Sequence, residues 1–145
     1  MRAAMALARS WGNGNYRKIR EVAEEMSIPQ RYTPEILGIL QRAGIAEARA
    51  GRNGGYRLSR DPAEISLLEV IEASEGSLKS QRCVMSGGPC HWQDTVCAVH
   101  PMLEAAGNAL TSSLRSQSLA SAVNFDQTLW KDYLRTHEET EPAGG

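Results

Sequence analysis

Three cysteines and a histidine lie close together in the middle of the chain. Cys83, Cys90 and Cys97 fall within fifteen residues, and His100 follows Cys97 by three positions. Thiolates and imidazoles are ligands of soft and borderline metal centres, so this set could hold a zinc ion or an iron–sulfur cluster. Structural zinc sites usually pair their ligands roughly two to four residues apart, whereas six residues separate each cysteine here from the next. The spacing favours a cluster, with three metal-free reduced cysteines as the alternative.

These four residues fall in a segment with no apolar periodicity. Residues 77–100 include Gly87-Gly88-Pro89 and contain no helical or strand pattern. A loop of this length in a compact domain is usually functional or disordered. We therefore predict a cysteine-rich, cluster-binding loop over 77–100.

The preceding residues predict a helix-turn-helix. Apolar residues recur at helical spacing over 18–26 and again in a second segment that ends at Ala43. This second helix could begin at Pro29 or at Thr33, since both positions offer suitable starts, and Gly44 ends it. Two short helices around a tight turn are typical of a helix-turn-helix.

Two short extended runs follow this motif. Residues 45–49 and 55–58 flank a glycine-rich turn, which predicts a β-hairpin. A hairpin directly after a helix-turn-helix is a wing. With a helix over 2–9 and another over 65–71, residues 1–76 are predicted to form a winged helix-turn-helix domain.

The C-terminal part predicts a dimerisation helix and a tail. From Met102 to about Ala120 the chain is predicted to form one long helix, whose apolar stripe includes Leu103, Leu110 and Leu114. This stripe has no intrachain partner in the pattern, so a homodimer is expected through residues 101–123. Residues 124–145 are predicted to be an acidic, partly disordered tail. The fold class is thus mainly α with a small β-hairpin: a winged helix-turn-helix plus a long C-terminal dimerisation helix.

The charge is divided unevenly along the chain, although the whole chain carries a net charge of only −1. Residues 1–60 hold 11 basic and 5 acidic residues, a net charge of +6, whereas residues 61–145 hold 5 and 12, a net charge of −7. Such a division indicates a nucleic-acid-facing module joined to a part that does not face nucleic acid.

Candidate DNA contacts come from the helix-turn-helix and the wing. Base-edge contacts in this motif come from the leading edge of the second helix, where the chain has Gln30, Arg31, Tyr32 and Thr33. In the wing, arginines flank glycines that allow close approach to a phosphate or a minor groove. The predicted wing residues are Arg49, Arg52, Asn53, Gly54, Gly55 and Tyr56.

Over residues 1–120 the chain resembles the winged-helix iron–sulfur transcription regulators, the family of IscR and NsrR. The resemblance rests on the helix-turn-helix, the Gly-Arg-Asn-Gly-Gly-Tyr-Arg-Leu wing over 51–58, and three cysteines before a long helix. It implies a homodimer that binds a palindromic operator, with DNA affinity set by the state of the cluster.

The same resemblance bears on the fourth ligand. In IscR-like members a histidine three residues after the third cysteine takes this position, which matches His100. In other members it is an acid of the partner's first helix, but no acid precedes Glu21 here. The uncapped start of the helix over 2–9 leads us to expect a natural start upstream of Met1, where such an acid could lie.

Composition bounds the remaining possibilities. With 145 residues, 41% hydrophobic and 23% charged, the chain suits one soluble domain, with no membrane span and no secretory signal. The leading hypothesis is a cytoplasmic DNA-binding regulator, not an enzyme, with a 2Fe-2S cluster on Cys83, Cys90, Cys97 and His100. The alternatives are a 4Fe-4S cluster, a zinc-stabilised winged-helix protein, and a thiol-dependent redox enzyme. The enzyme hypothesis is the weakest, because no Ser/His/Asp set, phosphate loop or paired carboxylates accompany the thiols.

Overall fold

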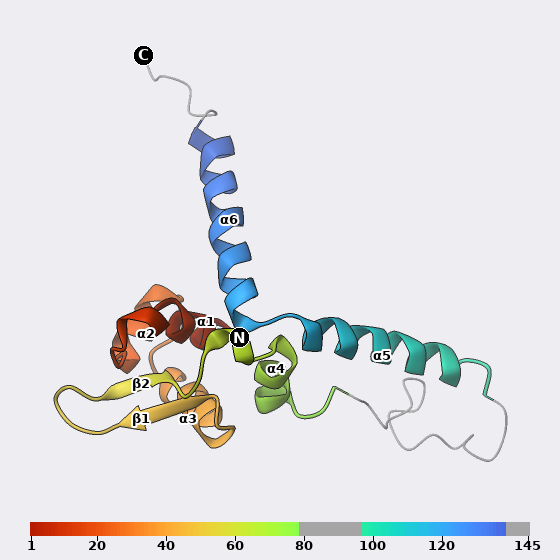
Figure 1. The fold of residues 1–145 in the computed structure, drawn as a ribbon, viewed down its shortest axis with the longest axis horizontal. Helices are drawn as coiled ribbons and strands as arrows, with labels where there is room; N and C mark the ends of the chain where they lie inside the picture. The colour runs from red at the N-terminus through yellow and green to blue at the C-terminus, as the bar shows by residue number, and fades with distance from the viewer. Residues whose placement is uncertain (79–96, 139–145) are drawn as a thin grey trace.

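The computed structural model describes residues 1–78 and 97–138, and these ranges contain six α-helices and one antiparallel hairpin (Figure 1). In chain order the elements are α1 (Arg2–Arg9), the 3-10 helix η1 (Trp11–Asn13), α2 (Ile19–Glu25), α3 (Thr33–Arg42), β1 (Ala46–Arg49), β2 (Gly55–Leu58), the 3-10 helix η2 (Pro62–Glu64), α4 (Leu67–Glu75), α5 (His100–Ser116) and α6 (Leu119–Glu138). The predicted mainly α fold with a small hairpin is confirmed.

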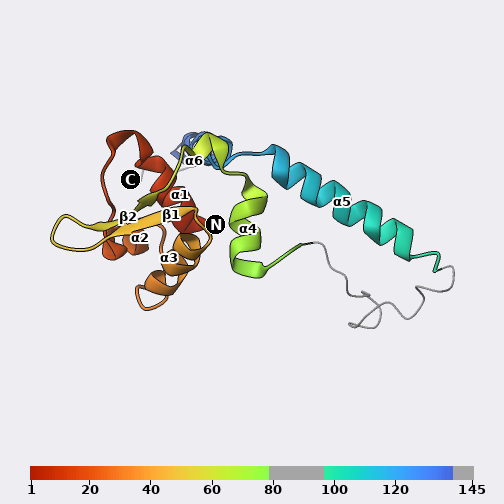
Figure 2. The same ribbon diagram turned by 60° about the horizontal axis from the view of Figure 1, so that its bottom comes forward.

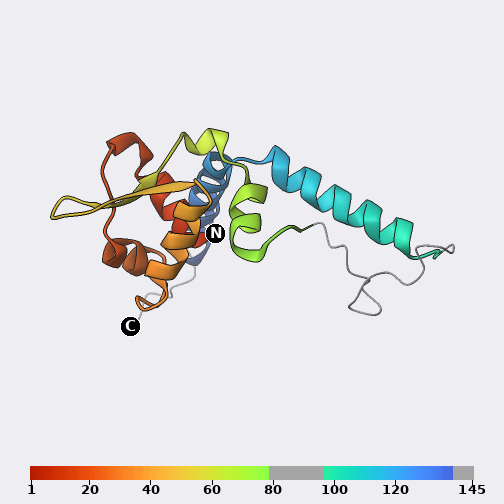
Figure 3. The ribbon, with the colours of Figure 1, turned by 90° about the horizontal axis from the view of Figure 1, so that it is seen from below.

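The first three helices and the hairpin form a head, from which the last two helices leave as arms. In Figure 1 the hairpin forms one side of the head, α5 extends from the opposite side, and α6 rises between them. Figures 2 and 3 show α5 extended in the same way after the molecule is turned, so its separation from the head does not depend on one viewing direction.

The core of the head is built around α1. Its alanines Ala3, Ala4 and Ala6 are almost completely buried, and small side chains let neighbouring helices approach closely. Larger side chains from the other elements close the core, and each contributes about 1.5–3 kcal/mol through burial. The largest fully buried apolar side chains are Leu7, Val22, Leu37, Ile45, Leu58, Ile65, Val70 and Leu119.

Helices α2 and α3 form the predicted helix-turn-helix. The turn begins at Ser27, which has a left-handed φ of 50°, and the Ile28 N–H donates to the Ala23 carbonyl at 2.9 Å. Of the two possible starts of the second helix, the structure has Thr33, with Pro34 in the first turn, where a missing N–H is tolerated.

The wing is an antiparallel hairpin with a third segment along its edge. Ala46 pairs with Leu58 and Arg49 with Gly55, so Glu47 and Arg57 are cross-strand partners. Beyond β2, Arg17 pairs with Tyr56 through two backbone hydrogen bonds of 2.8 Å each. The chain that leads into α2 is therefore fastened to the wing.

Helix α4 begins two residues later than the predicted 65–71 helix. Ser66 caps it: its hydroxyl accepts from the Glu69 N–H at 3.2 Å, while the Glu69 carboxylate accepts from the Ser66 N–H at 2.9 Å. Ile65 is extended instead, and its carbonyl accepts a hydrogen bond from the N–H of Leu119 at 2.7 Å.

The predicted single helix over Met102–Ala120 is wrong, because the chain forms two helices that part at Gln117. The Gln117 carbonyl accepts from the Leu67 N–H at 2.9 Å, a bond that holds Gln117 extended. Ser118 and Ser121 then cap α6 reciprocally, each hydroxyl accepting from the other residue's N–H at 3.1 Å. Tertiary backbone pairing, which periodicity does not report, breaks the helix.

Of the predicted acidic, partly disordered tail over 124–145, residues 124–138 belong to α6, and residues 139–145 lie outside the described ranges. Helix α6 is held on the head by the buried side chains of Leu119 and Val123. An ion pair adds to this, since Arg9 of α1 contacts both Asp126 of α6 and Glu25 of α2. Within the described ranges, no helix is long and apolar enough to span a membrane.

The wing junction yields a stability prediction. A Cβ at Gly55, whose φ is +149°, would lie 2.3 Å from the Arg17 carbonyl oxygen, a separation that backbone atoms cannot accept. We expect Gly55→Ala to lower the free energy of unfolding by about 1–3 kcal/mol, measured by urea denaturation. Gly12→Ala is the control, since a Cβ there meets nothing within 4 Å. Equal stability of the two variants would contradict the junction described here.

Candidate nucleic-acid interface and metal ligands

The turn before α3 presents three of the four predicted base-reading residues on the surface. Gln30 and Arg31 are exposed, and Tyr32 is 46% exposed. The guanidinium carbon of Arg31 lies 4.6 Å from the centroid of the Tyr32 ring, a cation–π contact. This stacking orders Arg31 while its N–H edge stays accessible, as a donor to a base or a phosphate requires.

Thr33 differs from these neighbours, and its assignment to the DNA-facing surface needs correction. It is completely buried, and its hydroxyl donates to the Pro29 carbonyl at 3.3 Å. Thr33 therefore fixes the start of α3 from inside. Its position at the head of the helix suggested a contact, but the side chain points toward the core.

The exposed face of α3 adds residues that the sequence reasoning missed. Gln41 and Arg42 are exposed near the helix C-terminus, and a Cβ on Gly38 would lie 3.3 Å from a guanidinium nitrogen of Arg42. Arg42 thus lies over Gly38, on the face that begins with the exposed Pro34. Helical spacing from Pro34 identifies this face, which continues beyond the first turn of α3.

Three of the six predicted wing residues are exposed to solvent. Arg49, Arg52 and Asn53 are exposed, whereas Gly54 is buried and a Cβ there would lie 2.0 Å from the Arg49 carbonyl oxygen. Tyr56 is half-buried and packs against the core. Gly54, Gly55 and Tyr56 therefore shape and seat the wing, and the available contacts are Arg49, Arg52 and Asn53.

A polar cluster covers the outer face of the wing sheet. The Tyr16 hydroxyl donates to the Glu47 carboxylate at 2.7 Å, and Arg57 donates to the same oxygen at 2.6 Å. These two hydrogen bonds lower the pKa of Glu47, and the bond to Glu47 raises the pKa of Tyr16. Arg57 and Arg49 both lie over the Tyr16 ring, 4.7 and 5.9 Å from its centroid. The Glu47–Arg57 cross-strand pairing could have been found from the hairpin register, but the contribution of Tyr16 could not.

Two of the four predicted metal ligands lie in the described part of the chain. Cys97 is half-buried, His100 is the exposed first residue of α5, and the His100 N–H donates to the Cys97 carbonyl at 3.2 Å. One tight turn therefore carries a thiol and an imidazole. Cys83 and Cys90 lie outside the described residues, and within 1–78 and 97–138 no group of three metal-binding side chains is present.

The winged-helix head agrees with a family comparison. The profile of the Rrf2 family, whose description is "Iron-dependent Transcriptional regulator", matches residues 1–124. The chain belongs to the Rrf2 family. It is therefore a DNA-binding transcription regulator with a winged helix-turn-helix, and Rrf2 regulators are often dimeric.

Individual relatives of this Rrf2 chain include proteins called IscR. The HTH-type transcriptional regulator IscR of Citrobacter koseri is 29% identical over 121 residues, which cover 83% of this chain and 73% of the relative. The solved structure of T. potens IscR has a TM-score of 0.66 at 24% identity, covering 99% of this chain and 86% of that one.

A second similar structure is CymR, the global cysteine regulator of B. subtilis. It has a TM-score of 0.71 at 20% identity, with 84% of this Rrf2 chain and 88% of that chain covered. At this level of identity, the likeness to CymR and to T. potens IscR establishes the shared winged-helix fold.

The opposite placements of Arg31 and Thr33 predict separable effects. Arg31→Ala should alter preference among operator sequences by about 1–3 kcal/mol at the contacted base pair and leave the free energy of unfolding unchanged. Thr33→Ala should instead lower that free energy by about 1 kcal/mol with the same base preference. Competition binding to randomised half-sites and urea denaturation measure the two effects. A changed base preference with unchanged stability in Thr33→Ala would contradict the buried placement.

Proposed function

We propose that this Rrf2 regulator is a cytoplasmic iron–sulfur sensor that binds operator DNA as a homodimer. Its DNA affinity depends on the state of a cluster held by Cys83, Cys90, Cys97 and His100. The observation that carries the proposal is the position of Cys97 and His100 at the start of α5, a helix whose outer face is apolar and exposed. Two of the proposed ligands thus lie at the start of the helix that carries the proposed dimer contacts.

The donor set fits an iron–sulfur cluster. Three thiolates and one imidazole match the ligand types of such clusters, and the described pair, Cys97 and His100, lies within one turn of backbone. The family description as iron-dependent supports iron over zinc. A neutral imidazole is a weaker donor than a thiolate and can be protonated or displaced, which suits a sensor. A 2Fe-2S cluster is proposed, with 4Fe-4S and zinc as the alternatives that the first metal analysis would distinguish.

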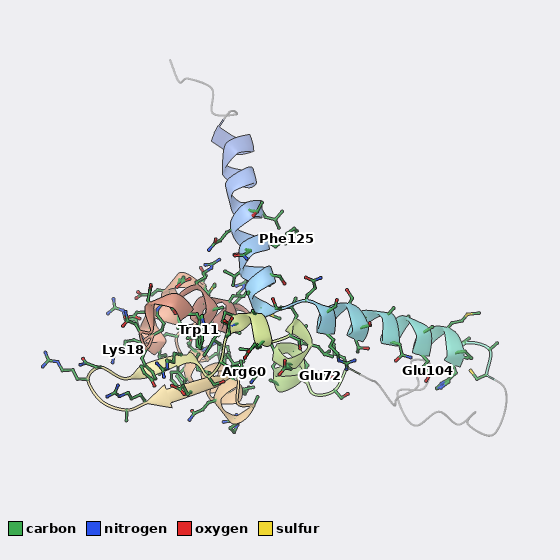
Figure 4. The ribbon with its side chains drawn as sticks, in the orientation of Figure 1. Trp11, Lys18, Arg60, Glu72, Glu104 and Phe125 are labelled. Atoms are coloured by element: carbon green, nitrogen blue, oxygen red, sulfur yellow. The ribbon has the colours of Figure 1, made fainter. Side chains whose placement is uncertain are left out.

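The exposed side chains of α5 support the homodimer. Met102 is 71% exposed, Leu103 is 40% exposed and Leu110 is 54% exposed, whereas Thr111 of the same helix is buried. On α6, Phe125 is 65% exposed and points away from the helix (Figure 4). Burying such side chains against a second copy contributes about 25 cal/mol per Å² of apolar area.

In the proposed complex, the exposed residues of the head meet DNA. Arg31 and its neighbours before α3 approach base edges, while Arg49, Arg52 and Asn53 of the wing approach phosphates or the minor groove. A two-fold dimer requires a palindromic operator whose half-sites lie about 34–36 Å apart, or a multiple of that distance.

The dimer proposal predicts a difference between two faces of α5. Leu110→Glu would bury a carboxylate in the interface, which should weaken dimerisation by about 3 kcal/mol, or roughly a hundredfold in Kd. Asn108→Glu adds the same charge on the polar face and should leave the dimer intact. Sedimentation equilibrium measures both. Monomeric wild-type protein that still binds its operator would contradict the proposal.

The cluster proposal predicts the composition of protein purified without oxygen. It should contain iron and acid-labile sulfide in near-equal amounts, and Cys97→Ala should abolish stable assembly. His100→Ala should retain a cluster but change its absorption spectrum and redox potential. His91, which is adjacent to Cys90, provides the control, and His91→Ala should change neither the spectrum nor the potential. Zinc without iron would replace the sensor proposal with the zinc-stabilised alternative. An unchanged spectrum and potential in His100→Ala would assign the fourth position to another ligand.

A further inference from the structure

Lys18 joins the tip of the wing to the start of α2. It is the N-cap residue of α2, and its backbone N–H donates to the Glu21 carboxylate at 3.0 Å. Its ammonium donates to the backbone carbonyl of Arg52 at 2.6 Å, across 34 positions of sequence. Figure 4 shows Lys18 between α2 and the wing hairpin.

The base of the wing is fastened independently of Lys18. Arg17 pairs with Tyr56 through the backbone, and its guanidinium contacts Glu25 at 2.7 Å and Glu21 at 3.2 Å. The turn beyond β1 and β2 closes through the Gly54 N–H, which donates to the Gly51 carbonyl at 3.0 Å. Lys18 is therefore the link between this turn and the helix-turn-helix.

The hydrogen bond from Lys18 to the Arg52 carbonyl restricts the backbone that carries the Arg52 side chain. An exposed turn that must become ordered on binding loses affinity through conformational entropy, and a contact made before binding reduces that loss. The ammonium uses one of its three N–H donors on the Arg52 carbonyl, which ties the position of this peptide to Lys18.

We propose that Lys18 is a positioning residue for Arg52, which fixes the wing tip for contact with the DNA backbone. This inference rests on the proposed function, in which the wing arginine meets a phosphate. DNA affinity would then depend on Lys18, which lies outside both the turn before α3 and the wing.

A double-mutant cycle on operator DNA tests the proposal, using the full-length dimer with Lys18→Met, Arg52→Ala and the double variant. Lys18→Met alone should weaken binding about three- to tenfold, but less than about twofold when Arg52 is already alanine. The salt slope of the double variant should match that of Arg52→Ala, about one unit below wild type. Additive losses with a slope about two units lower, or no loss in Lys18→Met, would overturn the proposal.

Two control variants separate geometry from charge. Lys18→Arg keeps a donor and should retain most of the affinity. Arg20→Met removes one positive charge from the exposed side of α2, where Arg20 pairs with Glu24 at 2.6 Å, and should change affinity less than Lys18→Met does.

Amide hydrogen exchange without DNA tests the contact itself. Lys18→Met should speed exchange of the Gly54 amide at the tip and leave the Arg17 and Tyr56 amides unchanged, and an unchanged Gly54 rate would overturn the positioning role. If Arg52→Ala leaves operator affinity unchanged, the proposed wing contact is wrong instead. The two failures are therefore distinguishable.

Discussion

Two backbone hydrogen bonds hold the C-terminal arms on the winged-helix head. They join Ile65 to Leu119 and Leu67 to Gln117, at the point where the chain enters α4 and where it passes from α5 to α6. Leu119, completely buried beside them, anchors the crossing in the core of the head. Because both arms diverge from this point, their outer faces are left uncovered by the rest of the described chain.

The basic residues of the N-terminal half differ in whether a salt bridge compensates their charge. Within residues 1–78 and 97–138, salt bridges engage Arg9, Arg17, Arg20, Arg57 and Arg60. No salt bridge in those ranges involves Arg31, Arg49 or Arg52, which lie in the recognition turn and the wing. Arg2, Lys18 and Arg42 also have no salt bridge in those ranges, so the uncompensated charges of the N-terminal half include the three arginines that we propose to face DNA but are not confined to them.

Local signals in the sequence predicted the head well. Apolar spacing identified α2 and α3, and the glycine-rich turn identified the wing, because helical periodicity and glycine conformation act over a few neighbouring residues. The break at Gln117 escaped prediction because it depends on pairing with Leu67, fifty positions away. The burial of Thr33 and the contact of Lys18 with Arg52 escaped for the same reason, since both depend on how distant segments pack.

The arrangement of α5 has a mechanical consequence. Its last turn adjoins the fixed crossing at Gln117, while His100 is at its opposite end. A helix of 17 residues is about 25 Å long, so a shift of about 2 Å at His100 turns it by only about 5° around that crossing. If His100 is a ligand, as proposed, a movement there would reach the head as a small tilt of α5 about the crossing at Gln117, with little displacement of the head itself.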